Sequence, residues 1–260
     1  PRSRARPNTC DTLMPGMTAR WLNIRRLRFL PAMEAGTLVS IIVVAGGVLL
    51  FSQLVEMVNG EPHAFDRWVL LALRNSSDLS DPIGPAWLEL VYRDITSLGG
   101  VAVLTLMTAV VVGFLLVDGK RAAAWFVLAS VTGGALLSPI LKLVFARPRP
   151  DLVPHLVEVS SASFPSGHAM LSAVVYLTLG ALLSRVEGPP RVKIYVLSIA
   201  ILLTFVVGMS RVCLGVHWPT DVLAGWCAGA AWATLCWRIA LALQRRGEVE
   251  GESMGRSREP

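Results

Sequence analysis

Long runs of apolar residues, separated by short polar or charged stretches, make up most of this chain. Runs without charged residues occur at about 35–55, 95–117, 122–141, 168–184, 194–210 and 222–237, the last extending past Arg238 to about Leu243. Each run has roughly 16 to 23 residues, and ~20 residues cross ~30 Å of hydrocarbon as an α-helix. The pattern therefore predicts an all-α integral membrane protein, a bundle of six transmembrane helices.

The composition supports a membrane protein and argues against a nucleic-acid partner. Hydrophobic residues make up 53% of the chain and charged residues 16%, whereas soluble domains carry about 25% charged residues. The net charge of +6 is concentrated in residues 1–34, which contain seven arginines against Asp11 and Glu34. The four cysteines show no paired spacing typical of a disulfide framework or a zinc site.

Lysine and arginine residues near the ends of the apolar runs predict the topology. They occur in residues 20–28, in the turn 118–121, in the loop 185–193 and just after Gln244. In a six-span bundle all of these positions lie on one side of the membrane. The positive-inside rule assigns that side to the cytoplasm, so we expect both termini to be cytoplasmic and the membrane to be the bacterial inner membrane.

The same pattern predicts the organisation of the chain. We expect a basic cytoplasmic segment at 1–34, a six-span domain at 35–243 and a polar cytoplasmic tail at 244–260. The domain includes an extracytoplasmic loop at 56–94 and a motif region at 142–221. The first apolar run has no small-residue cleavage pattern, which favours a retained first span over a secretory signal.

Three shorter stretches are expected to form helices outside the spans. In the outer loop these are Ala64–Leu73 and Trp87–Val91, where Trp68 and Trp87 suit an interfacial position. On the inner side, Trp21–Leu30 has the pattern of an amphipathic segment lying on the membrane with its arginines facing anionic lipid.

Four basic residues break the charge rule on the outer face. Lys142, Arg147, Arg149 and Arg211 all lie at or near the outer ends of spans, where basic residues should be depleted. Each one alone could snorkel or pair with a carboxylate of the outer loop. Four of them together indicate that something other than topology holds them there. The candidate carboxylates are Asp66, Asp78, Asp81, Glu89 and Asp94.

Lys142 and Arg149 form the first of three clusters at the outer ends of the third to sixth spans. Arg149 follows Lys142 by seven positions, about two helical turns. Pro148 and Pro150 predict that the helix ends before Arg149. The arginine then lies on a stiff extended segment. Two cations on a rigid corner suit an anion, and arginine can bind phosphate oxygens through two parallel hydrogen bonds.

The second cluster, residues 163–168, directly precedes the fourth span. Ser166 and Gly167 at a helix start leave backbone N–H groups and the positive end of the helix dipole available to a phosphate. His168 stands beside this anion-binding position. Taken alone, His168 is equally consistent with a cap or a loop contact.

The third cluster contains Ser210, Arg211, His217 and Asp221. Pro219 suits the first helical position of the sixth span, so Asp221 in the first turn can reach back to the imidazole of His217. A carboxylate partner fixes the tautomer and raises the basicity of the other ring nitrogen, as a histidine nucleophile requires. The alternative for Asp221 is a simple helix cap.

This inventory fits phosphoryl transfer through a phosphohistidine without a metal or other cofactor. It contains no cluster of carboxylates suited to magnesium and no set of ligands spaced for zinc. The three clusters resemble the three-part signature of the type-2 phosphatidic acid phosphatase superfamily, integral-membrane lipid phosphatases that share their site with vanadium haloperoxidases. Every signature position is occupied: Lys142, Arg149, Pro150, Pro165, Ser166, Gly167, His168, Ser210, Arg211, His217 and Asp221.

The resemblance implies a role for each residue. His217 would attack the phosphorus, Asp221 would orient His217, and His168 would protonate the leaving group and then activate water. The remaining groups would hold the equatorial phosphate oxygens: Lys142, Arg149, Ser166, the backbone amide of Gly167, and Arg211.

Several substrates and two other function classes remain open at this stage. An outward-facing site favours undecaprenyl diphosphate, with phosphatidic acid, phosphatidylglycerol phosphate and lipid A phosphates as alternatives. A lipid phosphotransferase has the same signature. A vanadium haloperoxidase is a remote alternative because those relatives are soluble, and a non-catalytic membrane transporter or scaffold would give the two histidines no role.

Overall fold

The computed structural model describes residues 35–58, 64–185 and 189–245. The expected amphipathic segment Trp21–Leu30 lies outside these residues. In chain order the described elements are α1 (Ala35–Val58), α2 (Ala64–Ala72), β1 (Arg74–Asn75), β2 (Asp78–Pro82), α3 (Trp87–Ser97), α4 (Val101–Val117), α5 (Arg121–Phe145), α6 (Gly167–Leu183), α7 (Pro190–Cys213) and α8 (Pro219–Arg245).

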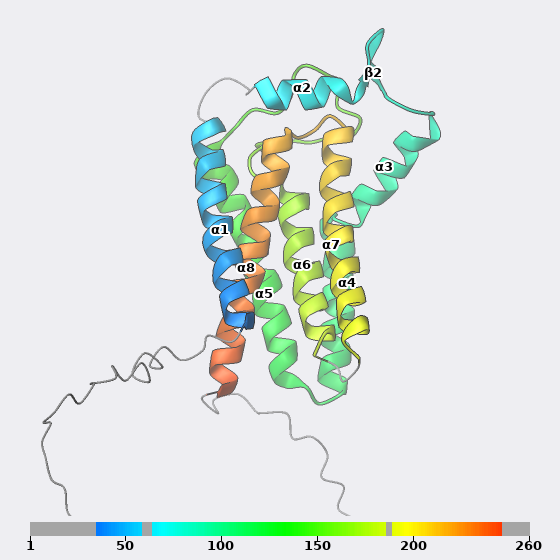
Figure 1. The fold of residues 1–260 in the computed structure, drawn as a ribbon. Helices are drawn as coiled ribbons and strands as arrows, with labels where there is room; N and C mark the ends of the chain where they lie inside the picture. The colour runs from blue at the N-terminus through cyan, green and yellow to red at the C-terminus, as the bar shows by residue number, and fades with distance from the viewer. Residues whose placement is uncertain (1–34, 59–63, 186–188, 246–260) are drawn as a thin grey trace, which may run out of the picture.

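The long helices form a bundle, and α2 lies across one end of it (Figure 1). Helix α6 packs against α5, α7 and α8, while α1 packs against α8 and α4 against α5. Apolar side chains point outward along the bundle, for example Val117 with 91% and Leu143 with 82% exposure. An apolar outer surface on helices of this length suits contact with lipid.

Among the described residues, four helices are each long and apolar enough to cross a membrane: α1, α5, α7 and α8. The bent pair α3–α4 makes a fifth candidate, and α6 is a shorter apolar helix. The expectation of a helical integral membrane protein is thus confirmed, while the count of six spans stays a prediction.

The expected run at 95–117 is not one straight helix. Residues 95–97 belong to α3, and α4 begins only at Val101, with a bend of 45° between the two helices. Gly100 is extended, with φ −71° and ψ 146°. A Cβ on Gly99 would lie 2.3 Å from Val207 and 3.4 Å from His168. The break therefore depends on the close approach of Gly99 to α6 and α7, which the apolar pattern does not reveal.

The outer loop holds the two expected helices and an additional hairpin. Helix α2 matches the expected segment, and α3 extends to Ser97, past the expected end at Val91. Between them β1 and β2 pair antiparallel, with Ser76 and Ser77 at the turn. The fold is all-α as expected, and this short hairpin, where Asn75 accepts hydrogen bonds from Ser77, is a small addition to it.

Three helix ends meet where the motifs were expected. Helix α5 ends at Phe145, and Ala146 takes the left-handed conformation with φ 44°. Helix α6 begins at Gly167 with Ser166 as its N-cap, and α8 begins at Pro219. Pro148 and Pro219 therefore act as the sequence pattern predicts, one after a helix end and the other at a helix start.

Close packing of α8 against α6 depends on two glycines. A Cβ on Gly225 would lie 2.7 Å from the carbonyl oxygen of Ser166, and a Cβ on Gly229 would lie 2.5 Å from that of Met170. The absence of side chains lets the two backbones approach, as is common between helices in lipid. This contact sets the start of α6 beside the start of α8.

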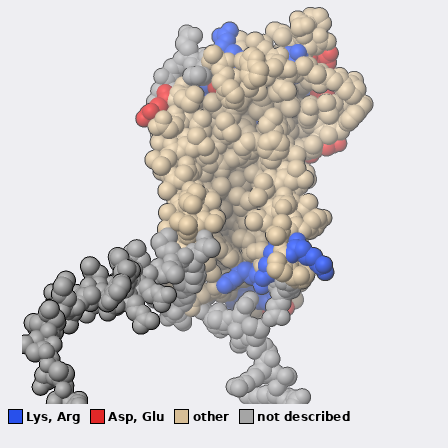
Figure 2. Space-filling model, in the orientation of Figure 1, with Lys and Arg blue, Asp and Glu red and all other residues tan. Residues whose placement is uncertain are grey.

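The charged side chains lie mainly at the two ends of the bundle, with a wide uncharged band between them (Figure 2). The end that holds the α4–α5 turn and the α6–α7 connection is basic. Its exposed residues are Lys120, Arg121, Arg185, Arg191 and Lys193. Helix α2 lies at the opposite end (Figure 1).

Candidate active site

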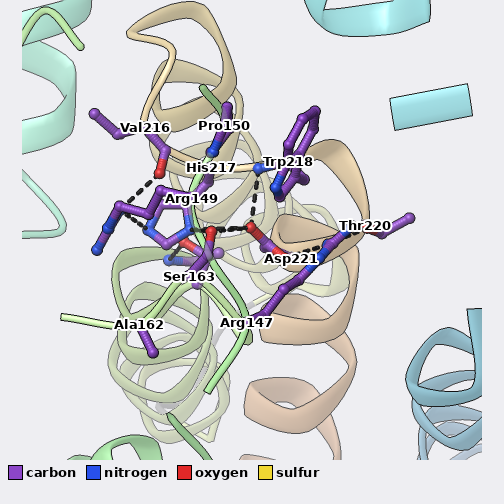
Figure 3. A network of polar contacts seen from close by, with 12 residues as sticks. Arg147, Arg149, Pro150, Ala162, Ser163, Val216, His217, Trp218, Thr220 and Asp221 are labelled. Carbon is purple, nitrogen blue, oxygen red and sulfur yellow. Dashed lines mark hydrogen bonds and ion pairs between the residues drawn. The ribbon is translucent and has the colours of Figure 1, made fainter. Parts of the chain in front are cut away.

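His217 lies in the loop between α7 and α8 and is 1% exposed. Its Nδ1 lies 3.4 Å from Oδ2 of Asp221, which the first turn of α8 directs back toward the imidazole. The same oxygen accepts hydrogen bonds from the backbone N–H of Trp218 at 2.9 Å and from the hydroxyl of Ser163. Figure 3 shows this network around the carboxylate.

Arg149 lies beside the other ring nitrogen of His217. Its Nη1 is 3.3 Å from Nε2 of His217 and donates to the carbonyl oxygen of Val216 at 2.6 Å. Its Nε donates to the carbonyl oxygen of Ser161 at 2.8 Å. The extended segment after α5 therefore holds the guanidinium against Nε2, as Figure 3 shows.

The surroundings of His217 favour its neutral form. Burial lowers the pKa of His217 to about 4. The hydrogen bond to Asp221 and the charge of Asp221 raise this pKa, while the positive charges of Arg149 and Arg211 lower it. At pH 7 the imidazole is neutral and carries a free lone pair, which is the form a nucleophile needs.

Lys142 belongs to the last turn of α5 and points toward the start of α6. Its ammonium group donates to the carbonyl oxygen of Ala162 and lies 3.4 Å from the hydroxyl of Ser161. Its Cε would lie 3.5 Å from a Cβ on Gly167. The lysine thus lies beside the N-terminus of α6, where the helix dipole also favours an anion.

Arg211 is 4% exposed and only partly hydrogen-bonded. Its Nη1 donates to the hydroxyl of Thr96 at 3.0 Å, and its buried Nε has no hydrogen-bond partner among the described residues. A buried donor without a partner costs about 1–3 kcal/mol.

The two histidines and three of the four outer cations converge. His168 interacts electrostatically with Arg211, His217, Lys142 and Arg149. Helices α5, α6 and α7 and the two outer connections thus contribute to one site. Within the described residues no three His, Cys, Asp or Glu side chains are grouped as for a metal ion.

Ser166 is fully buried and caps α6. Its hydroxyl accepts the backbone N–H of Ala169 at 3.5 Å, and its own backbone N–H donates to the carbonyl oxygen of Asp221 at 2.9 Å. The serine therefore ties the start of α6 to the start of α8. Its expected contact with phosphate stays a prediction.

Comparison with known proteins agrees with this arrangement. The model of the PAP2 superfamily matches residues 123–245. Phosphatidylglycerophosphatase B of Bacillus subtilis (strain 168) is 37% identical over 144 residues, which are 55% of this chain and 70% of that protein. The chain belongs to the PAP2 superfamily. The resemblance drawn from the three clusters is thereby confirmed.

Further relatives of the PAP2 superfamily support the same assignment. The crystal structure of the first transmembrane PAP2 type phosphatidylglycerolphosphate phosphatase, from Bacillus subtilis, superimposes with a TM-score of 0.69 at 30% identity. The match covers 78% of this chain and 98% of that one. Undecaprenyl-diphosphatase of Sulfolobus acidocaldarius is 35% identical over 100 residues, 36% of this chain and 44% of that protein. This PAP2 protein is a membrane phosphatase, a phosphoric ester hydrolase.

Arg147 of this PAP2 chain differs from the other three outer cations. Its guanidinium pairs with Asp66 at 2.8 Å and with Asp221 at 2.6 Å. Arg147, which has no phosphate-binding role in the resemblance, forms an ion pair with an outer-loop carboxylate, the alternative considered for a single cation. The reason is geometric, because α2 brings Asp66 over the start of α8.

Three residues that the sequence did not reveal bond to charged groups in and beside the PAP2 signature. Ser163 meets Asp221, Thr96 meets Arg211, and Thr220 meets both Arg147 and Asp66. Thr220 directly precedes Asp221 in the sequence, and Ser163 lies two residues before Pro165. Closeness in sequence to a signature residue was therefore the available signal. Thr96 lies before the matched region, at the start of an expected apolar run, and nothing in the sequence linked it to Arg211.

Proposed function

We propose that this PAP2 protein hydrolyses a lipid phosphate through a phosphohistidine formed on Nε2 of His217. The observation that carries the proposal is that the two ring nitrogens of His217 have different neighbours. Nδ1 lies at Asp221, and Nε2 lies at Arg149. Nε2 is therefore the nitrogen available to a phosphate held by the cations.

In the first step a bond forms between Nε2 of His217 and phosphorus, and the bond between phosphorus and the lipid oxygen breaks. His168 gives a proton to the departing oxygen. Nδ1 keeps its proton and donates to Asp221, which stabilises the positive charge that develops on the ring.

In the second step His168 takes a proton from water, and the water oxygen attacks phosphorus. The nitrogen–phosphorus bond breaks and inorganic phosphate leaves. Throughout, the equatorial oxygens bear the charge that positioned donors must stabilise. We assign that stabilisation to Lys142, Arg149, Arg211, Ser166 and the backbone amide of Gly167.

We place the reaction at the extracytoplasmic face of the bacterial inner membrane, in a bundle of six spans. The basic end of the bundle favours the cytoplasmic side under the positive-inside rule. The first described residue of α1 and the last of α8 lie at that end (Figure 1), which supports cytoplasmic termini. The histidines lie at the other end.

Phosphatidylglycerophosphate is the substrate that the comparisons favour. The phosphatidylglycerophosphatase B similarity spans 70% of that protein, whereas the undecaprenyl-diphosphatase similarity spans 44%. Undecaprenyl diphosphate, favoured by the outward-facing site, is the second candidate. In that case the group that departs from phosphorus in the first step would be undecaprenyl phosphate.

Phosphate release by the detergent-purified protein tests the proposal. The substrates are phosphatidylglycerophosphate, undecaprenyl diphosphate and phosphatidic acid, each assayed in EDTA with His217→Ala alongside. We expect release by the original protein, no release by the variant, and an acid-labile, base-stable phosphoenzyme in the original protein alone. Full activity in folded His217→Ala would contradict the assigned nucleophile.

A further inference from the structure

Asp66 is a fully buried carboxylate on a helix that sequence reasoning assigned to a surface loop. It lies on α2 with 0% exposure, while Phe65 and Trp68 on the same helix are 42% and 69% exposed. Its oxygens accept hydrogen bonds from the backbone N–H and the hydroxyl of Thr220 at 2.9 and 2.6 Å. A carboxylate with no exposure needs such partners, because burying an unpaired charge is costly.

Arg147 connects Asp66 to the carboxylate that faces the nucleophile. Its Nη2 lies 2.8 Å from Asp66, and its Nη1 lies 2.6 Å from Oδ1 of Asp221. Oδ1 is the oxygen of Asp221 that does not face His217. Arg147 therefore holds one side of the carboxylate and leaves Oδ2 directed at the imidazole.

The two ion pairs of Arg147, with Asp66 and with Asp221, depend on each other. A guanidinium is planar, so fixing one end against Asp66 fixes the direction of the other end. The ring of Trp218 covers the guanidinium at 5.5 Å. The charge of Asp66 also offsets that of Arg147, which would otherwise weaken Asp221 as a partner for a positively charged imidazole.

We propose that Asp66 is a positioning residue for the reaction, acting through Arg147 and Asp221 on His217. This inference rests on His217 being the nucleophile. Asp66 lies before the region 123–245 that matches the PAP2 model. Helix α2 lies across the end of the bundle (Figure 1). Through Asp66 this helix would help to position the nucleophile.

The experiment changes the charge near Asp221 in opposite directions with two variants. The charged or titratable groups that act on His217 from the elements around it are Asp221, Arg149, Arg211 and His168. Asp66→Asn keeps the shape but removes a negative charge, and Arg147→Gln removes a positive one. Asp78→Asn is the matched control, since Asp78 is exposed and, among the described residues, its side chain accepts hydrogen bonds from Ser80 of the same hairpin.

The readouts are kcat, KM and the acidic limb of kcat/KM against pH, with phosphatidylglycerophosphate in detergent. We expect Asp66→Asn to lower kcat by about 10- to 100-fold, as outer-shell partners of active-site histidines do, with KM little changed. Its acidic limb should move to lower pH, and that of Arg147→Gln to higher pH, each by about one unit. Asp78→Asn should behave as the original protein.

Two further variants distinguish failure of the Asp66 proposal from failure of the His217 assignment. Arg147→Lys retains the charge without the planar fork, so we expect a lower kcat with an unmoved limb, and this variant replaces Arg147→Gln if the latter does not fold. Loss of activity in Asp66→Asn without a limb shift, or unchanged kcat, overturns the positioning role. Activity retained in folded His217→Ala instead overturns the nucleophile assignment, whatever Asp66→Asn does.

Discussion

The hydroxyl of Ser163 donates to the carboxylate oxygen of Asp221 that faces the imidazole of His217. Ser163 also lies 3.4 Å from Nδ1 of His217. It is fully buried just before α6, and its backbone N–H donates to the carbonyl oxygen of Arg147 at 2.8 Å. The serine thus fixes the direction of the oxygen on which the tautomer of His217 depends.

Replacing Ser163 by alanine should slow the reaction without weakening substrate binding. A hydrogen bond to a charged group contributes about 1.5–3 kcal/mol, so we expect kcat to fall by about tenfold or more and KM to change little. Steady-state phosphate release gives both constants. Ser80→Ala in the exposed hairpin is the control, and a rise in KM with unchanged kcat would contradict this role.

The pH dependence should report the buried state of His217. Its pKa is lowered to about 4, chiefly by burial, and the neutral imidazole is the reactive form in the proposed mechanism. We expect kcat/KM, corrected for titration of the substrate, to hold from pH 7 to about 5 and to fall near pH 4. A fall in kcat/KM near pH 6.5, the ordinary pKa of histidine, would show that burial does not lower the pKa of His217.

The same shift predicts a stability change with pH. The unfolded chain takes up a proton on this histidine near pH 6.5, whereas the folded chain resists until about 4. The unfolded state therefore binds more protons between these values, and the free energy of unfolding should fall as the pH is lowered through this window. Thermal unfolding of the original protein and of His217→Gln, compared at pH 7 and 5, measures the difference.

Arg149→Lys should be a damaging change although it keeps the charge. The guanidinium bonds Ser161 and Val216 while it lies at Nε2 of His217. An ammonium group cannot reproduce this planar arrangement. We expect kcat/KM to fall by about 10²- to 10³-fold, as for loss of one donor to a developing charge. Arg93→Lys on the exposed face of α3 is the control.

The parts of the fold that local chemistry determines were predictable from the sequence. Pro148 cannot continue α5, and Pro219 suits a helix start, so the ends of both helices follow from residue type. The spacing of His217 and Asp221 places the imidazole just before α8 and the carboxylate in the first turn of α8. These features need no knowledge of the rest of the chain.

Features that depend on distant partners were not predictable. Asp66 is one of several carboxylates in the outer loop, and only the folded chain brings it to Thr220, 154 residues away. Ser163 donates a hydrogen bond to Asp221, which lies 58 residues further along the sequence. Gly99 interrupts an apolar run because His168 and Val207 lie against it. In each case the deciding contact is tertiary, and the residue type alone is compatible with ordinary surface or helix positions.

The contact between α6 and α8 should decide both stability and activity. A Cβ on Gly225 would lie 2.7 Å from the carbonyl oxygen of Ser166, and backbone atoms cannot move aside as a flexible side chain can. Gly225→Ala should therefore push apart the starts of α6 and α8, and with them the groups at Gly167 and Asp221. Overpacking typically costs about 1–3 kcal/mol, so we expect lower thermal stability in detergent and reduced kcat.

Gly113→Ala is the matched control for this change. It also lies in a helix, but nothing approaches its Cβ position within 4 Å. Alanine is the better helix former by about 0.8–1 kcal/mol, so this variant should be as stable as the original protein or more so, with unchanged kcat. Equal melting temperatures and rates for both alanine variants would mean that the two helix starts are not held together by the glycine contact. The site would then tolerate a wider gap between Ser166 and Asp221 than its hydrogen bonds indicate.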